Sequence, residues 1–183
     1  MTLKQFFPLV ILVFIISLSC NNEEPVVEEI DDREEMTTLL LVLETPNQSS
    51  PSIFQFEDLD GPGGNPPTII ADTLTANTQY FASIEVFNGT ENITPVIEQL
   101  QKEHQAFFIP TDVPLTFTYA DQDEDGFPIG LFTAIRTGSA ATGNLSIALV
   151  HDPNKGGFEV SQGNLNNAGG RIDIQVSIPI VVE

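Results

Sequence analysis

The two histidines, His104 and His151, are the residues of this chain best suited to bind a transition metal, and Asp152 directly follows the second. Imidazole nitrogens and carboxylate oxygens are the donors that Zn²⁺ and related ions take in proteins. His104 is expected beside Leu100 on the apolar face of a helix, and His151 at the inward-facing end of a strand. This placement predicts two separate, partly buried packing histidines whose rings lie too far apart to share an ion. The alternative is a metal site formed by both histidines with a nearby carboxylate.

A run of alternating aspartates offers oxygen ligands of the kind that Ca²⁺ prefers. Asp121, Asp123 and Asp125 alternate along the chain, and Gly126 permits the sharp turn that a calcium loop needs. The position where an EF-hand would place its bidentate glutamate is Phe132, so this is not an EF-hand loop. The hypotheses left open are a looser calcium site and a plain hairpin turn, since Asp-Gly is common in such turns. No cofactor is expected to be required.

Catalytic signatures are missing from the sequence. It has no Gly-x-Ser-x-Gly elbow, no His-Glu-x-x-His motif and no Gly-rich phosphate loop. A carboxylate-based hydrolase stays a remote alternative, because a glycosidase needs only two acidic residues placed across a cleft. The prediction is therefore that the protein is not an enzyme.

Cys20 is the only cysteine, and it stands where a bacterial lipoprotein would carry its lipid. It follows a basic start at Lys4 and an apolar run over residues 9–16, which is too short to span a bilayer. A cysteine directly after such a segment indicates a lipoprotein signal, although Leu18 lies two residues before it rather than the usual three. We predict a signal peptide over residues 1–19 and a lipid on Cys20. The alternative is an ordinary signal peptide with a chance cysteine.

Acidic residues dominate the chain and restrict its partners. Asp and Glu number 26 against 6 Lys and Arg, which gives a net charge of -20. Nucleic-acid phosphates would be repelled, and so would anionic lipid, so the acyl chains must supply the membrane affinity. Residues 20–36 are the most acid-rich and predict a disordered tether. Residues 37–183 have the length of one domain.

From residue 37 onward, short stretches of alternating apolar and polar residues predict β-strands. We expect strands over 37–44, 52–58, 68–74, 80–87, 115–119, 130–137, 145–149 and 171–180. One inserted helix is expected from an N-cap at Thr94, through Pro95, to about Gln105. Such a pattern predicts an all-β, Ig-like antiparallel sandwich. The segment 74–80 resembles a fibronectin type III corner, in which the tyrosine, here Tyr80, bonds back to the turn.

Six segments, residues 56–61, 91–94, 103–108, 125–131, 151–155 and 168–170, resemble a set of small outer-membrane lipoproteins of flavobacteria, within the Bacteroidetes. Such proteins often carry the description "type 1 periplasmic binding fold superfamily", but that fold has two α/β lobes and about twice this length. The resemblance implies an outer-membrane location, on the cell surface rather than the periplasmic face, and no established activity. Acidic residues after Cys20 resemble the surface-export signal of these bacteria, and Asp72-Thr73-Leu74 resembles their O-glycosylation acceptor.

These patterns together predict a lipid-anchored binding or accessory module of the cell envelope. An outer-membrane uptake receptor is the expected kind of partner. The alternative is a metal-binding lipoprotein, with Ca²⁺ at Asp121–Asp125 or a transition metal at His104 and His151.

Overall fold

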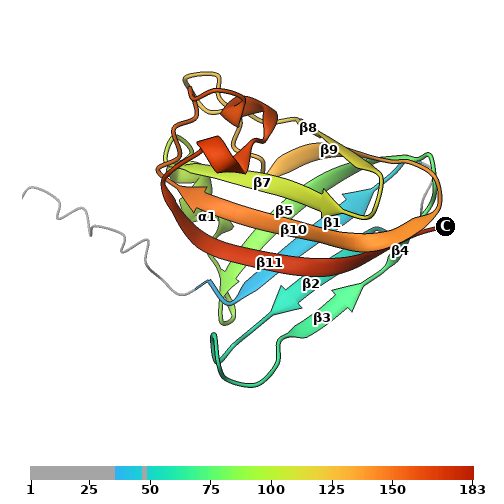
Figure 1. Cartoon of the computed structure of the whole chain (residues 1–183). Helices are drawn as coiled ribbons and strands as arrows, with labels where there is room; N and C mark the ends of the chain where they lie inside the picture. Colours follow the sequence, from blue (N-terminus) through green and yellow to red (C-terminus); the bar gives the residue numbers. More distant parts are fainter. Residues whose placement is uncertain (1–35, 47–48) are drawn as a thin grey trace, which may run out of the picture. The chain divides into compact units, whose positions relative to one another are not determined.

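The computed structural model describes residues 36–46 and 49–183, and these form a mostly β domain with two sheets and one short α-helix (Figure 1). Cys20, the predicted signal peptide and all of the predicted tether except Met36 lie outside the described residues. No helix in the described part of the chain is long and apolar enough to cross a membrane.

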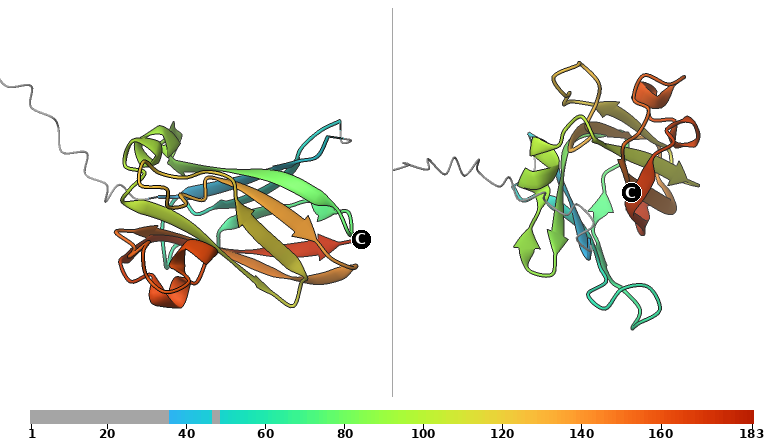
Figure 2. Two further views of the ribbon diagram at one scale, coloured as in Figure 1. Left: turned by 90° about the horizontal axis from the view of Figure 1, so that it is seen from above. Right: turned by 90° about the vertical axis from the view of Figure 1, so that its left-hand side faces the viewer.

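The larger sheet, sheet A, has seven strands. Its order is β3 (Thr68–Ala71), β2 (Ser52–Glu57), β1 (Thr38–Glu44), β5 (Gln79–Asn88), β9 (Phe132–Thr137) and β8 (Leu115–Tyr119), with β6 (Glu91–Asn92) paired to β5. Sheet B has the order β4 (Thr73–Leu74), β11 (Arg171–Val182), β10 (Ala141–His151) and β7 (His104–Thr111). One of the two sheets curls into a half-barrel (Figure 2).

The strands bury one face each because apolar side chains occupy every second position. Leu39, Leu41 and Leu43 of β1 are at most 1% exposed, and Ile147 and Ile178 of sheet B are fully buried. These residues belong to one apolar cluster that joins both sheets. Burying each such side chain contributes roughly 1.5–3 kcal/mol to stability.

The outer face of sheet B is covered at its β7 side. The chain from 152 to 170 contains two short 3-10 helices, η1 (Val160–Gln162) and η2 (Leu165–Asn167), which lie beside β7 in Figure 1. Val160 packs there with Phe107, Ala148 and Val150 in a second apolar cluster. Ala148, which the alternation places on the polar face of its strand, is therefore fully buried.

The predicted strands are present, but the one predicted over 68–74 is divided into two. The stretch predicted over 68–74 splits at Asp72 because the chain changes sheets there: β3 pairs with β2, whereas β4 pairs in parallel with β11. Asp72 fixes the change by its side chain, since Ile53 N donates to its Oδ2 at 2.7 Å.

The helix prediction is wrong in extent and in its cap. Helix α1 covers only Thr94–Gln99, and Ile93 is its N-cap residue. The Thr94 hydroxyl is used elsewhere, since it accepts a hydrogen bond from Val86 N at 2.8 Å. His104, expected on the helix, instead begins β7. Pairing of β7 with β10 decides this, because a tertiary partner overrides weak local helix preference.

The predicted tyrosine corner is confirmed. Thr75 N donates to the Tyr80 hydroxyl at 2.8 Å, and Tyr80 is only 2% exposed. The confirmed fold is mostly β with two sheets, whereas the Ig-like topology stays a prediction.

Candidate metal centre

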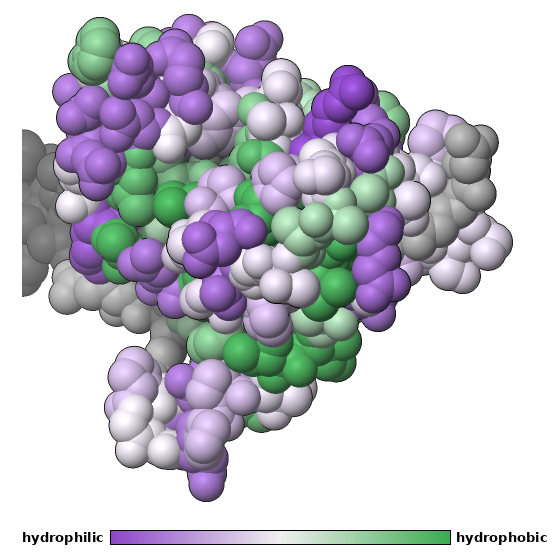
Figure 3. Space-filling model, turned by 45° about the vertical axis from the view of Figure 1, so that its right-hand side comes forward, coloured by the Kyte–Doolittle hydropathy of each residue, from purple (hydrophilic) through white to green (hydrophobic). Residues whose placement is uncertain are grey.

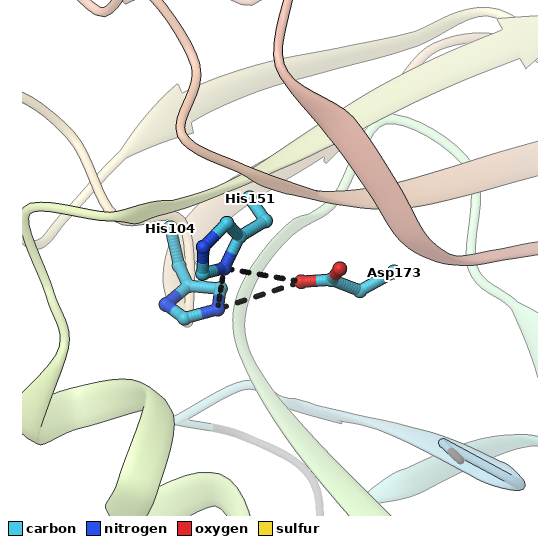
Figure 4. A group of neighbouring side chains, drawn as sticks. All are labelled: His104, His151 and Asp173. Carbon is cyan, nitrogen blue, oxygen red and sulfur yellow. Dashed lines mark hydrogen bonds and ion pairs between the residues drawn. The ribbon is translucent and has the colours of Figure 1, made fainter. Parts of the chain in front are cut away.

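Two histidines and one aspartate meet at one end of sheet B (Figure 4). His104 is the first residue of β7 and His151 the last of β10, and the two are direct partners in the antiparallel register. Directly opposed residues project from the same face of a sheet, so both rings point the same way. Asp173 of β11 completes the group, which is called the inner cluster below.

A β-bulge turns Asp173 toward the histidines. Leu149 pairs with Ile174, but the next residue, Val150, pairs with Ile172, so Asp173 is the extra residue of β11. Bulges of this kind re-aim a side chain. Ile172 is accordingly 47% exposed, whereas the Asp173 side chain is 4% exposed. Strict alternation would have given the opposite arrangement.

The three candidate ligand atoms have the spacing of a metal site. His151 Nδ1 lies 3.1 Å from His104 Nε2. Asp173 Oδ2 lies 3.4 Å from His104 Nε2 and 3.8 Å from His151 Nδ1. The circle through three atoms so spaced has a radius of about 2.0 Å, so one ion close to their plane can lie within the Zn–N bond range of all three. Tetrahedral ligands at that bond length lie about 3.3–3.4 Å apart, whereas octahedral neighbours lie about 3.0 Å apart. The spacing therefore fits tetrahedral Zn²⁺ better.

A backbone carbonyl sets the tautomer of His104. Its Nδ1 lies 3.1 Å from Leu100 O, and a carbonyl can only accept, so Nδ1 carries the proton. The lone pair is then on Nε2, which points into the cluster. Metal-binding histidines are commonly oriented by such a bond from the other ring nitrogen. The His104 side chain is 2% exposed, so this lone pair is shielded from water.

Asp173 has one satisfied and one unsatisfied oxygen. Arg171 Nη2 donates to Oδ1 at 2.9 Å, whereas Oδ2 is buried and has no hydrogen-bond partner among the described residues. Two lone-pair-bearing atoms, His104 Nε2 and Asp173 Oδ2, thus face each other at 3.4 Å in a nearly dry environment. Such a pair is unfavourable unless a cation, either a proton or a metal ion, lies between them.

Asp152, which the sequence grouped with His104 and His151 in one metal site, does not belong to the inner cluster. Its Oδ2 lies 3.5 Å from His151 Nε2, on the side of the ring that faces away from the inner cluster. Its side chain is 72% exposed, whereas that of His151 is 13% exposed. Glu103 lies on the same side, and its ligand atom is within 4.8 Å of those of His151 and Asp152.

The expectation that the two rings lie too far apart is wrong. Their centroids are 4.8 Å apart and the rings are nearly perpendicular. The error follows from the helix prediction, because a helical His104 could not lie opposite His151. Asp173 was missed for a second reason: between Ile172 and Ile174 it has the pattern of an ordinary outward-facing polar residue.

The carboxylates proposed for Ca²⁺ have separate partners in the structure. Gly130 N donates to Asp121 Oδ1 at 2.8 Å, and Phe132 N donates to its Oδ2 at 2.9 Å. Asp125 is exposed and lies 3.1 Å from Lys102 Nζ. In the part of the chain that the structure describes, these aspartates are in neither of the groups whose ligand atoms converge. A calcium site here stays a prediction.

Asp123 forms a buried ion pair with Lys155. Lys155 Nζ donates to Asp123 Oδ2 at 2.8 Å and to Gln101 O at 2.6 Å, and both side chains are at most 5% exposed. Phe127 N donates to Asp123 Oδ1 at 2.9 Å. Burial raises the pKa of Asp123, but the Lys155 and backbone hydrogen bonds outweigh it and hold the pKa below its ordinary 3.8. The pair ties residue 101, next to Leu100, to the chain that follows Asp152.

Comparison with protein-family models, with curated proteins and with solved structures gives no match. The functional inference therefore depends on the geometry of the inner cluster.

Proposed function

We propose that this protein binds a transition-metal ion, with Zn²⁺ as the best match, through His104 Nε2, His151 Nδ1 and Asp173 Oδ2. The observation that carries the proposal is the convergence of these atoms to 3.1–3.8 Å of one another. Two imidazoles and one carboxylate are a common donor set for zinc. Water or another small ligand would take the fourth position.

The surroundings of the cluster support a ligand role over simple packing. Each candidate ligand has its other polar atom near a partner: Leu100 O for His104, Asp152 for His151 and Arg171 for Asp173. Such outer partners orient metal ligands and make them better donors. A packing role for the histidines requires only that their own hydrogen bonds are made. It does not explain why Asp173 Oδ2 is buried beside them without a hydrogen bond.

We place this metal site in a lipoprotein of the cell envelope, with the lipid on Cys20 and residues 20–36 as the tether. The strongly acidic composition supports this use, because a negative field raises the local concentration of cations. Replacing Cys20 by Ser should release the protein from outer membranes and abolish acyl labelling. Continued sedimentation with membranes would contradict the anchor. No catalytic residue is assigned.

Calorimetric titration with Zn²⁺ tests the metal proposal, and the soluble Cys20→Ser protein removes the thiol as a competing ligand. One saturable site is expected. His104→Ala, His151→Ala and Asp173→Asn should each weaken binding tenfold or more, whereas Asp112→Asn, a carboxylate change at the other end of β7, should not. Absence of Zn²⁺ binding, or binding indifferent to all three ligand changes, would overturn the proposal. Substituted Co²⁺ should show the intense visible absorption of tetrahedral coordination.

The outer face of sheet A favours a second candidate function, partner binding. Phe81 of β5 and Phe132 of β9 are 55% and 51% exposed, and Phe81 pairs with Ala134, two residues from Phe132. The two rings are therefore diagonal neighbours on one face. Figure 3 displays a different side of the domain, on which apolar side chains also gather in patches between strongly hydrophilic ones.

Acidic residues beside this face suggest the chemistry of the partner. A groove of about 240 Å³ next to Phe132 is lined in part by Glu85 and Glu98. We propose a protein partner with an apolar centre and a basic rim, and the outer-membrane receptor expected from the sequence is the candidate. Phe81→Ser with Phe132→Ser should abolish crosslinking to that partner in intact membranes and leave Zn²⁺ binding unchanged. Phe158→Ser, at another exposed aromatic residue, is the control; equal crosslinking in all variants would contradict the candidate.

We also propose that the domain is a divergent Ig-like sandwich. The Thr75–Tyr80 hydrogen bond and the shared core of the two sheets support this assignment. A crystal structure whose strand connections differ from those of Ig domains would refute it.

A further inference from the structure

We propose that His151 serves a second, outer metal group, formed with Glu103 and Asp152, which loads the inner cluster. The ligand atoms of these three residues lie within 4.8 Å of one another. Glu103 and Asp152 are exposed, and His151 is the least buried member of the inner cluster. This inference rests on the proposed metal-binding function and adds the route by which the ion arrives.

The strand pairing brings the outer group together. Glu103 directly precedes His104 in the chain, and Asp152 directly follows His151, so the paired ends of β7 and β10 carry both acids to one place. Asp152 N donates to Glu103 O at 2.7 Å, which extends the pairing by one step. Asp152 then adopts φ 50°, and its carboxylate lies 3.5 Å from His151 Nε2. His151 therefore has ligand groups on both ring nitrogens.

The hydrogen bonds direct the lone pair of His151 outward first. In the neutral imidazole His104 Nε2 is an acceptor, because His104 Nδ1 donates to Leu100 O. His151 Nδ1, at 3.1 Å from that nitrogen, is then the donor, and His151 Nε2 carries the lone pair that faces Asp152. With this bond in place, a cation that arrives at the surface meets one imidazole nitrogen and two carboxylates whose ligand atoms lie within 4.8 Å of one another.

When the ion moves from the outer group to the inner cluster, it leaves His151 Nε2 and binds His151 Nδ1, and a proton replaces it on Nε2. His151 Nδ1 releases its proton to water as it takes the ion, and Nε2 takes a proton from water, so the imidazole stays neutral. The Nε2–H can then donate to Asp152, in the outer position that orients a metal ligand. The two ion positions would lie on the order of 6 Å apart on opposite sides of the ring. An ion could thus exchange water for protein ligands in steps on its way to a buried site.

Stopped-flow measurement of Zn²⁺ uptake and release tests this loading role in the Cys20→Ser protein. The Glu103→Gln, Asp152→Asn double variant should bind Zn²⁺ at least tenfold more slowly and release it more slowly by a similar factor. A group that only transfers the ion changes both rates and leaves the affinity nearly unchanged, with one Zn²⁺ bound per chain. The matched control is Glu124→Gln with Asp125→Asn, which removes the same charge from an exposed acidic pair beside Lys102.

The possible results separate the two proposals. Wild-type rates in the double variant, or an equal slowing in the control, would overturn the loading group and leave the inner cluster standing. Two Zn²⁺ bound per wild-type chain, or faster release from the double variant, would show a permanent ligand role and would also overturn it. A wild-type protein that binds no Zn²⁺ would refute the proposed function, and the loading group with it.

Discussion

At the residue scale, two buried aspartates with opposite surroundings separate structure from candidate function. Every hydrogen bond that Asp123 needs is supplied by Lys155 and by the backbone N–H groups of Asp125 and Phe127. Asp173, equally buried, keeps one oxygen without a hydrogen bond and turns it toward His104. A satisfied buried carboxylate stabilises a fold, whereas an unsatisfied one beside two imidazoles indicates a place for a cation.

The first prediction concerns the Asp123–Lys155 pair. Because the pKa of Asp123 is lowered in the folded protein, its contribution is present above about pH 4 and is lost as the pH falls through the folded pKa. Asp123→Asn should flatten this acid dependence and, by leaving Lys155 buried without its counter-charge, cost about 3 kcal/mol at pH 7. Urea unfolding over a pH series measures both effects. Asp112→Asn is the control, and a variant with the wild-type acid slope would disprove the assignment.

At the element scale, two irregularities create the inner cluster. The chain leaves α1 at Gln99 and enters β7 at His104, which brings His104 opposite His151. The bulge in β11 then rotates Asp173 inward. The pairing of β7 with β10 is thus the scaffold of the site, and it requires close approach of the two strands along their whole length.

The second prediction tests that scaffold at its far end. A Cβ added to Gly143 of β10 would clash with the backbone oxygen of Thr111, so Gly143→Ala must push the two backbones apart. We expect a loss of about 2–3 kcal/mol, as for other overpacked sites. Gly156→Ala, where the added Cβ would meet only the Phe127 ring at 3.7 Å, should change stability far less. Chemical denaturation measures the difference; equal stability of both variants would contradict the packing argument.

Charge is the dominant property at the scale of the whole molecule. With a net charge of -20, the folded protein repels itself, and a compact state suffers more from this than an expanded chain. The same field favours cations near the surface and basic surfaces on partners. The negative field therefore supports both the proposed binding of a metal ion and the proposed binding of a partner with a basic rim.

The third prediction follows from this self-repulsion. Raising NaCl from about 20 to about 300 mM shortens the screening length severalfold, so the melting temperature at pH 7 should rise. EDTA in all samples removes any contribution from bound metal. Close to pH 4, where many carboxylates are protonated, the salt effect should shrink. A melting temperature that does not change with NaCl concentration at pH 7 would contradict the self-repulsion, because it would show that the acidic groups are already neutralised within the fold.

The sequence by itself determined most of the strands, the tyrosine corner and the charge. Alternation and turn residues are local signals, so they located β1, β5 and β11 to within a few residues, and the bond of Tyr80 to its own turn spans only five residues. The histidines were recognised as candidate ligands because residue type alone limits metal chemistry. The lipid on Cys20 and the calcium hypothesis stay predictions.

Only the tertiary structure brought the three residues of the inner cluster together. Whether residues 100–105 continue a helix or enter β7 depends on the partner strand β10, more than thirty residues later, and no local pattern reports it. The burial of Asp173 depends on a one-residue register shift between β10 and β11, which reverses the face that alternation assigns to Ile172 and Asp173. Strand pairing and register are set by contacts between distant segments, because their free energy comes from the shared core rather than from local preference.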